Sequence, residues 1–252
     1  MPTQPKSSEL LTRLLAGEMT ALARAITMID NELPGHAAFL GTVPDKPRTT
    51  PVVGFTGAPG VGKSTLINAY TALCRSQDRS VAVVSVDPSS PISGGAILGD
   101  RLRMAEHVQD DGVYIRSLAS RGHLGGLCRN IGQVLRVIDT AGWDVIVLET
   151  VGTGQSEVEV ASIADVKIVV NAPGMGDSVQ AMKSGILEIA DILVVNKADM
   201  PQAGQASKEL RAMLRLRSKS MATVPVIETV ATGHTGIDEL SAAIDGCRRC
   251  ME

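Results

Sequence analysis

Residues 57–64 constrain the fold of this chain more than any other segment. They read Gly-Ala-Pro-Gly-Val-Gly-Lys-Ser, follow the apolar run Val52–Phe55 and precede a helical pattern near 63–76. In such a loop, successive backbone N–H groups wrap phosphate oxygens, and the N-terminus of the helix adds partial positive charge. Glycines at positions 57, 60 and 62 keep Cβ atoms away from the ligand. The segment therefore predicts a strand, a phosphate loop and a helix in succession.

Short β-branched runs recur along the rest of the chain and alternate with helical patterns. Such an alternation is typical of a mostly parallel sheet with helices on both faces, so we predict an α/β P-loop NTPase. The expected strands are Val52–Phe55, Val81–Val86, Val113–Ile115, Val145–Leu148, Val166–Val170, Ile192–Val195 and Val224–Ile227. The expected helices lie near 63–76, 99–108, 124–139, 178–190, 204–218 and 236–248.

The first 50 residues differ in pattern from the remainder. Leucine and isoleucine recur at helical spacing over residues 8–30, which predicts one or two amphipathic helices. Prolines at positions 34, 44, 47 and 51 then mark a connector. We expect a short N-terminal helical extension and linker over residues 1–50 and a GTPase domain over residues 51–252.

Charge and composition narrow the classes of partner. The formal net charge of −3 gives no basic field for a nucleic acid backbone. No stretch approaches the roughly 20 apolar residues of a membrane span, and the first residues lack the apolar core of a secretory signal. We therefore expect a cytoplasmic protein that binds neither nucleic acid nor membrane. The 4 cysteines are too sparse for a disulfide framework. The Cys247/Cys250 pair is interpreted as incidental at the end of a helix, with metal or redox chemistry as the alternative.

Each residue of the phosphate loop has an expected task. Lys63 should reach the β- and γ-phosphates and act in catalysis, and the Ser64 hydroxyl should bind Mg²⁺. The residues expected to contact the nucleotide here are Gly57, Ala58, Pro59, Gly60, Val61, Gly62, Lys63, Ser64 and Thr65.

Two carboxylates follow expected strands, at the edge of the sheet where ligands bind in open α/β folds. Asp87 ends the second strand and Glu149 ends the fourth. Because Mg²⁺ prefers oxygen ligands, we expect both residues at the metal and in catalysis. Gly152 lies three residues after Glu149, where its N–H could contact the γ-phosphate as part of a switch that senses hydrolysis.

The base is indicated by Asn196-Lys197-Ala198-Asp199, which directly follows a strand. Guanine presents N1–H and a 2-amino group, two neighbouring donors that one carboxylate can accept together, whereas adenine lacks both. We expect Asp199 to accept from guanine, and Asn196 and the Lys197 stem to support the loop and cover the ring. The motif favours GTP over ATP.

Several longer strings resemble the MeaB/ArgK family, the GTPase chaperones of adenosylcobalamin-dependent acyl-CoA mutases. They are Val86–Pro91, Gly94–Met104, Ser120–Gly126 and Glu149–Glu157, and the similarity covers about residues 8–245. The resemblance implies a Mg²⁺-dependent GTPase that cycles slowly between GTP and GDP, gates cofactor loading and protects the mutase. A cobalamin adenosyltransferase is a second candidate partner.

The same resemblance implies further site residues. Asp100 would join Ser64 at Mg²⁺, and Arg103 stands where the family has a switch arginine, a catalytic candidate. In the loop that relays the nucleotide state to the mutase, the candidates are Asp177, Gln180 and Lys183. The family's base-contacting Ser-Ala loop corresponds here to Val230, Ala231 and Thr232, which lack one hydroxyl and keep the backbone contact. Family members continue into a C-terminal dimerisation arm, and because this chain stops at Glu252 a homodimer of that kind is not expected.

Three other functions stay open at this point. A nickel-insertion GTPase would need clustered histidine or cysteine ligands, and His36, His107, His123 and His234 are scattered. A small-molecule kinase is the second, because the ArgK branch has carried an amino-acid transport kinase name. The third is a regulatory module that holds nucleotide without turnover. No glutamine can be named as the residue that positions the attacking water.

Overall fold

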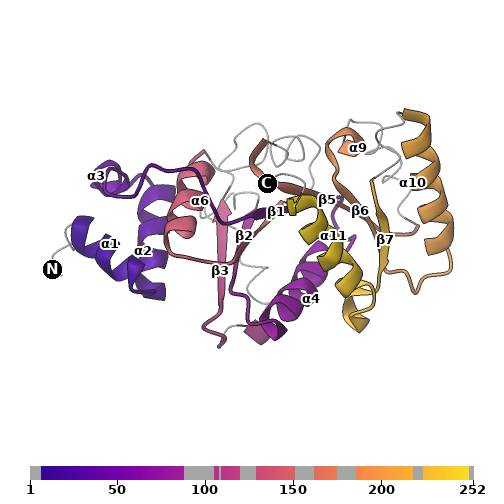
Figure 1. Ribbon diagram of the computed structural model, residues 1–252, viewed down its shortest axis with the longest axis horizontal. Coiled ribbons are helices and arrows are strands. Elements are labelled where there is room, and N and C mark those ends of the chain that lie inside the picture. Colours follow the sequence, from indigo (N-terminus) through magenta and orange to yellow (C-terminus); the bar gives the residue numbers. More distant parts are fainter. Residues whose placement is uncertain are drawn as a thin grey trace, which may run out of the picture.

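Parallel strands form one sheet in the order β3-β2-β4-β1-β5-β6-β7 (Figure 1). The computed structural model describes residues 7–87, 105–107, 109–119, 129–150, 162–174, 186–217 and 224–249. The strands in these ranges are β1 (Val52–Thr56), β2 (Val81–Asp87), β3 (Val113–Ala119), β4 (Val145–Thr150), β5 (Val166–Asn171), β6 (Ile192–Asn196) and β7 (Val226–Thr229). The predicted α/β P-loop NTPase fold, with a mostly parallel sheet, is confirmed.

Helices cover both faces of the sheet. They are α1 (Ser7–Leu15), α2 (Met19–Asp30), α3 (His36–Leu40), α4 (Lys63–Ser76), α6 (Ile131–Thr140), α9 (Ile186–Ile189), α10 (Ala203–Arg217) and α11 (Ile237–Arg249), with 3₁₀ turns η1 (Ala105–His107) and η4 (Ala231–Gly233). None of the helices within the described ranges is long and apolar enough to cross a bilayer.

Three buried clusters divide the core between the two faces. On one face, α4 and α11 pack against the central strands, with Phe55, Tyr70 and Leu240 in a single cluster. On the opposite face, α2 and α6 pack over β2 and β4, and α10 packs over β5 and β6. Burial of aliphatic side chains on both faces explains why the strands read as continuous apolar runs.

Some element limits differ from the sequence-based expectation. The helix expected near 124–139 begins at Ile131, and the last strand begins at Val226 instead of Val224. The short helix α3 lies inside the expected connector, because Phe39 is fully buried in the cluster that α1 and α2 share. The helices expected near 99–108 and 178–190 lie largely outside the described residues, which show η1 and α9 in those places.

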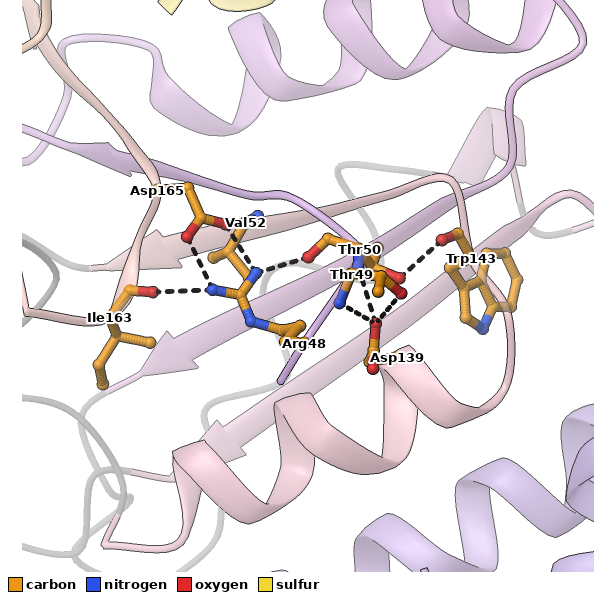
Figure 2. A network of polar contacts seen from close by, with 8 residues as sticks. All are labelled: Arg48, Thr49, Thr50, Val52, Asp139, Trp143, Ile163 and Asp165. Atoms are coloured by element: carbon orange, nitrogen blue, oxygen red, sulfur yellow. Dashed lines mark hydrogen bonds and ion pairs between the residues drawn. The ribbon is translucent and has the colours of Figure 1, made fainter. Parts of the chain in front are cut away.

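The connector before β1 is fixed to the sheet by the polar network of Figure 2. Arg48 donates to both carboxylate oxygens of Asp165, at 2.7 and 2.9 Å, and Asp165 also accepts from the Val52 backbone N–H at 2.7 Å. A second carboxylate, Asp139 on α6, accepts from the backbone N–H of Thr49 at 3.0 Å and of Thr50 at 2.8 Å. These contacts hold the linker in place, and the predicted division at residue 50 stays a prediction.

Candidate functional site

The phosphate loop turns between the end of β1 and the start of α4 through glycines with positive φ. The φ angles are +143° at Gly57, +81° at Gly60 and +92° at Gly62. Gly57 also passes directly over β5, since a Cβ added there would lie 2.2 Å from the Val170 carbonyl oxygen. Only glycine suits a backbone that combines this φ with so close an approach. The sequence therefore fixes the loop geometry at Gly57.

Lys63 is the first residue of α4, and its side chain lies across the loop. Its Nζ donates to the carbonyl oxygens of Gly57 at 2.7 Å and Ala58 at 3.1 Å. The side chain is buried, so the ammonium is held beside the loop and away from bulk solvent. The Lys63 ammonium thus lies at the N-terminus of a 14-residue helix. Its charge adds to the partial positive charge of the helix end, and both favour a bound anion.

Buried carboxylates lie at the ends of two neighbouring strands, and one of them contacts the first turn of α4. Ser64 Oγ donates to Glu149 Oε1 at 2.7 Å, and Ser85 Oγ donates to Glu149 Oε2 at 3.3 Å. Asp87 ends β2, which pairs with β4, and it is buried like Glu149. The expected metal-binding residues Ser64, Asp87 and Glu149 are thus gathered at neighbouring ends of parallel elements, and their role as ligands stays a prediction.

This set of oxygen donors fits Mg²⁺. The structure shows a hydroxyl in direct contact with a buried carboxylate, on a helix that begins at the phosphate loop. Mg²⁺ is usually bound through one or two carboxylates, together with water and substrate phosphates, so it needs no complete protein cage. A histidine or cysteine cage is accordingly unnecessary for this ion.

Asn196 joins the end of β6 to two loops. Its Nδ2 donates to the carbonyl oxygens of Val61 at 3.0 Å and Gly62 at 3.4 Å. Its Oδ1 accepts from Thr229 Oγ1 at 3.1 Å and from the Ala231 backbone N–H at 3.3 Å. The buried amide therefore ties the phosphate loop to the loop after β7.

A pocket of about 320 Å³ opens beside this junction. Lys197, with φ +57°, forms part of its wall and donates from Nζ to the Gly60 carbonyl oxygen at 2.8 Å. Polar groups, including the Asp199 carboxylate, share the lining with apolar side chains. The lining residues are Gly62, Thr65, Asn196, Lys197, Asp199, Met200, Val230, Ala231 and Thr232. This mixed lining of polar and apolar residues suits a ring with polar edges.

The described structure brings together most of the residues that the sequence analysis selected. The loop 57–65 contacts the Asn196–Asp199 segment, which lines one pocket together with the 230–232 loop, and Glu149 contacts Ser64 at the start of α4. Asp100, Arg103, Gly152, Asp177, Gln180, Lys183 and His123 lie outside the described residues, and their roles stay predictions.

Three residues in this region were missed by sequence reasoning. Ser85 contacts Glu149. Strand alternation places Ser85 on the same face as Asp87, so the sequence could have marked it as a residue near the site. Met200 lines the pocket directly after Asp199, so its position beside the motif was a second signal. Thr229 supports Asn196 through a side chain at the end of β7, and no sequence pattern marked it.

Comparison with known proteins finds relatives over most of the chain. Residues 22–252 match the family described as methylmalonyl-CoA mutase-associated GTPase MeaB. A provisionally named GTPase of Pyrococcus abyssi is 43% identical over 248 residues, which span 97% of this chain and 76% of that protein. The GTPase ArgK of Escherichia coli is 41% identical over 196 residues, spanning 76% of this chain and 59% of that protein. A crystal structure of a LAO/AO transport system kinase, 28% identical, matches with TM-score 0.78 over 99% of this chain and 77% of that chain.

Proposed function

We infer the function of this chain from its family: it belongs to the methylmalonyl-CoA mutase-associated GTPases. We propose that it binds GTP with Mg²⁺, hydrolyses it slowly, and acts as the nucleotide-driven chaperone of an adenosylcobalamin-dependent acyl-CoA mutase. The observation that carries the proposal is the junction at Asn196, which places a pocket containing Asp199 directly beside the phosphate loop.

Guanine recognition is assigned to Asp199. Its carboxylate lines the pocket and could accept from N1–H and the 2-amino group of guanine together. The Lys197 stem is held along the pocket by the bond from Nζ to Gly60, so it would cover one face of the ring. Adenine offers no matching pair of donors, and this difference supports GTP over ATP.

The phosphates are assigned to the loop and to Lys63. The Lys63 ammonium contacts the Gly57 and Ala58 carbonyls at the loop, so a triphosphate in the loop would lie within its reach. Backbone N–H groups and the α4 N-terminus would hold the remaining oxygens. These donors are preorganised, and they would stabilise charge on the phosphoryl oxygens as the γ-phosphate is transferred to water.

The metal is assigned to the oxygen donors of Ser64, Asp87 and Glu149, with Asp100 as a fourth candidate from the family resemblance. When bound, Mg²⁺ would neutralise charge on the β- and γ-phosphates. These protein groups would set its place, and their arrangement supports the proposal: Glu149 accepts from Ser64 through one oxygen and from Ser85 through the other. Arg103 and Gly152 are proposed as switch residues on the same family grounds.

The coupling to a mutase rests on the family description. Nucleotide-dependent binding requires that GTP and GDP favour different states of the chain, so the mutase must distinguish them by affinity. Asp177, Gln180 and Lys183 are the proposed contact residues, and a cobalamin adenosyltransferase is the second proposed partner. We expect the complex to change in affinity between GDP and a non-hydrolysable GTP analogue.

The nucleotide proposal is tested by hydrolysis with purified protein. We expect Mg²⁺-dependent release of phosphate from GTP and little from ATP. Lys63→Ala should abolish it, whereas Lys208→Ala, the same change on the exposed face of α10, should leave it intact. Equal hydrolysis of ATP, or full activity in Lys63→Ala, would contradict the proposal.

The chaperone proposal is tested by binding to cobalamin-dependent acyl-CoA mutases in each nucleotide state. Equal affinity with GDP and with the GTP analogue would overturn it. Two control assays address other functions: transfer of labelled γ-phosphate to an amino acid would indicate a kinase, and stoichiometric nickel binding would indicate metal delivery.

A further inference from the structure

Three polar side chains at the carboxyl ends of β1, β4 and β5 each carry a buried atom that has no hydrogen-bond partner in the described structure. Thr56 is 1% exposed, Thr150 is 0% exposed and Asn171 is 7% exposed. Within the part of the chain that the structure describes, the unpartnered atoms are Thr56 Oγ1, Thr150 Oγ1 and Asn171 Nδ2. Buried polar groups in folded proteins nearly always have partners, so three on adjacent strands require an explanation.

The three side chains lie on one face of the sheet. The strand order is β4-β1-β5, and Phe55 pairs with Glu149, so the next residues, Thr56 and Thr150, are neighbours across the two strands. Thr56 pairs with Val169, two residues before Asn171. Neighbouring strands are about 4.8 Å apart and each residue advances about 3.3 Å, so Asn171 lies about 7 Å further along.

This face is the one turned away from α4. Phe55 and Val170 belong to the cluster that contains α4 side chains, and alternation along each strand turns Thr56 and Asn171 the other way. On β4, Glu149 contacts Ser64 of α4, so the adjacent Thr150 also points to the opposite side. The three polar groups thus face a common region.

That region adjoins the phosphate loop. Thr56 immediately precedes Gly57, and Gly57 lies against the Val170 carbonyl, next to Asn171. Thr150 immediately follows Glu149, the carboxylate that holds Ser64. Each of the three residues is therefore one position from a group that fixes the loop or its first helical turn.

The two threonine hydroxyls lie on neighbouring residues of paired strands, where one water molecule can bridge them. Each hydroxyl can accept one O–H group of that water, and a lone pair is then left free on the water oxygen. Asn171 is the next polar group along the same face of the sheet. We propose that Thr56 and Thr150 bind the water that attacks the γ-phosphate.

The proposal rests on the proposed GTPase function and supplies its missing water-positioning group. The free lone pair of the water forms a bond to the γ-phosphorus, while the bond from that phosphorus to the β,γ-bridging oxygen breaks. GDP leaves with that electron pair, and the water proton ends on inorganic phosphate. The two hydroxyls orient the water and gain no proton overall.

The test uses isosteric removal of each hydroxyl. Thr56→Val and Thr150→Val keep the side-chain shape, and Thr71→Val is the matched control, because Thr71 in α4 is equally buried and its hydroxyl is likewise unpartnered. Single-turnover GTP hydrolysis, affinity for a GTP analogue and melting temperature are measured for each variant.

We expect Thr56→Val and Thr150→Val to hydrolyse GTP about tenfold more slowly or worse, since misplacement of a reactant has effects of that size. Analogue affinity should stay within about twofold, and the melting temperature should not fall, because a buried unpaired hydroxyl is removed. Thr150→Ser should recover the rate, and Thr71→Val should hydrolyse like the wild type.

Two results would overturn the assignment while the GTPase proposal stands: wild-type rates in both valine variants, or a loss of analogue affinity that matches the loss of rate. The second would mean that these groups contact phosphate directly. A wild-type chain without GTP hydrolysis would instead overturn the GTPase proposal itself, and the water assignment with it.

Discussion

The side-chain amide of Asn196 donates to the carbonyl oxygen of Val61 at 3.0 Å, so the end of β6 is joined directly to the phosphate loop. The other side of the same amide accepts from Thr229 Oγ1. Asn196 is 2% exposed, and these bonds are therefore shielded from competing water. The pocket and the loop consequently hold their relative position through one side chain.

Asn196→Ala should weaken both nucleotide binding and the fold. It leaves the Val61 carbonyl and the Thr229 hydroxyl without this partner, at a cost of about 2 kcal/mol in the free energy of unfolding. GTP and GDP affinity should fall by the same factor, because the loop geometry serves both. Fluorescent nucleotide titration and urea denaturation measure the two effects. Asn31→Ala, at an exposed position after α2, is the control, and a selective loss of GTP affinity would speak against this role.

Asp199→Asn should change the preferred base from guanine to xanthine. The carboxylate accepts two hydrogen bonds from guanine, and their loss should cost on the order of 2–4 kcal/mol in GTP binding. Xanthine carries a 2-oxo acceptor where guanine has an amino group, and the asparagine amide can donate to it. Competition between GTP and XTP measures the change. Asp111→Asn, at an exposed turn, should keep the guanine preference, whereas unchanged GTP affinity in Asp199→Asn would remove Asp199 from the base site.

Ser64→Ala should reduce hydrolysis more than Ser64→Thr. The alanine variant loses the hydroxyl that contacts Glu149 at 2.7 Å and is assigned to Mg²⁺, whereas threonine keeps it. We expect a loss of about 100-fold in GTP turnover for alanine, the scale of removing one preorganised stabilising group. Chelation of Mg²⁺ should abolish wild-type turnover, and Ser76→Ala, exposed at the end of α4, should behave like the wild type. Turnover that survives chelation would contradict the metal assignment.

The connector should loosen at low pH because of Asp139. Burial raises the pKa of Asp139, but hydrogen bonds from Thr50 and Thr49 outweigh it, so the pKa lies below the ordinary value of 3.8. A folded-state pKa below the unfolded value means that the carboxylate stabilises the fold above about pH 4 and loses this effect as pH falls through the folded pKa.

The Asp139→Asn variant tests whether the Asp139 carboxylate stabilises the fold above about pH 4. It should destabilise the protein by about 1–2 kcal/mol at neutral pH, because one oxygen still accepts but carries no charge. The difference from the wild type should shrink as pH falls below about 4 and through the lowered pKa of the folded state, where the wild-type carboxyl becomes protonated. Melting curves between neutral and acid pH follow both proteins. A constant difference across that range would exclude Asp139 as the titrating group.

Arg48→Lys should destabilise the fold although the charge is kept. Lysine cannot reproduce the paired bonds that Arg48 makes to the two oxygens of Asp165. Both side chains are partly exposed, so solvent screening limits the expected loss to about 1 kcal/mol. Chemical denaturation measures it, with Arg24→Lys on the exposed side of α2 as the control. Equal stability of the two variants would mean that the paired geometry contributes nothing.

Most of the sheet could be predicted because its strands are continuous apolar runs, but the limits of two strands were predicted wrongly. Polar Arg116 and Ser117 interrupt the run of β3, which nevertheless continues to Ala119; Arg116 there donates to Thr27 of α2 at 2.8 Å. The last strand begins after Pro225, which has no N–H to give to a ladder. The end of β3 depends on a contact with α2, which is far away in the sequence. The start of β7, by contrast, could have been read from Pro225.

The candidate site likewise contains residues that could be predicted from the sequence and residues that could not. Lys63 and Asp199 were predictable because each lies in a motif whose spacing carries the chemistry. The contact of Ser85 with Glu149 depends on β2 and β4 being neighbours, although 64 residues separate the two side chains. Strand order is a property of the folded sheet, so the alternation that places Ser85 on the face of Asp87 does not identify Glu149 as its partner.

The protein contains 1 tryptophan, Trp143, and its place in the connector network gives the chain an internal optical probe. The Thr50 hydroxyl donates to its carbonyl oxygen at 3.0 Å, and its ring lies 6.1 Å from that of Tyr114. Trp143 precedes β4, whereas Glu149 lies near the opposite end of that strand, about 20 Å away at the usual strand rise. Intrinsic emission at this distance senses the linker and not the nucleotide directly. Any change of emission on exchanging GDP for GTP would therefore record a signal that has crossed the length of the sheet.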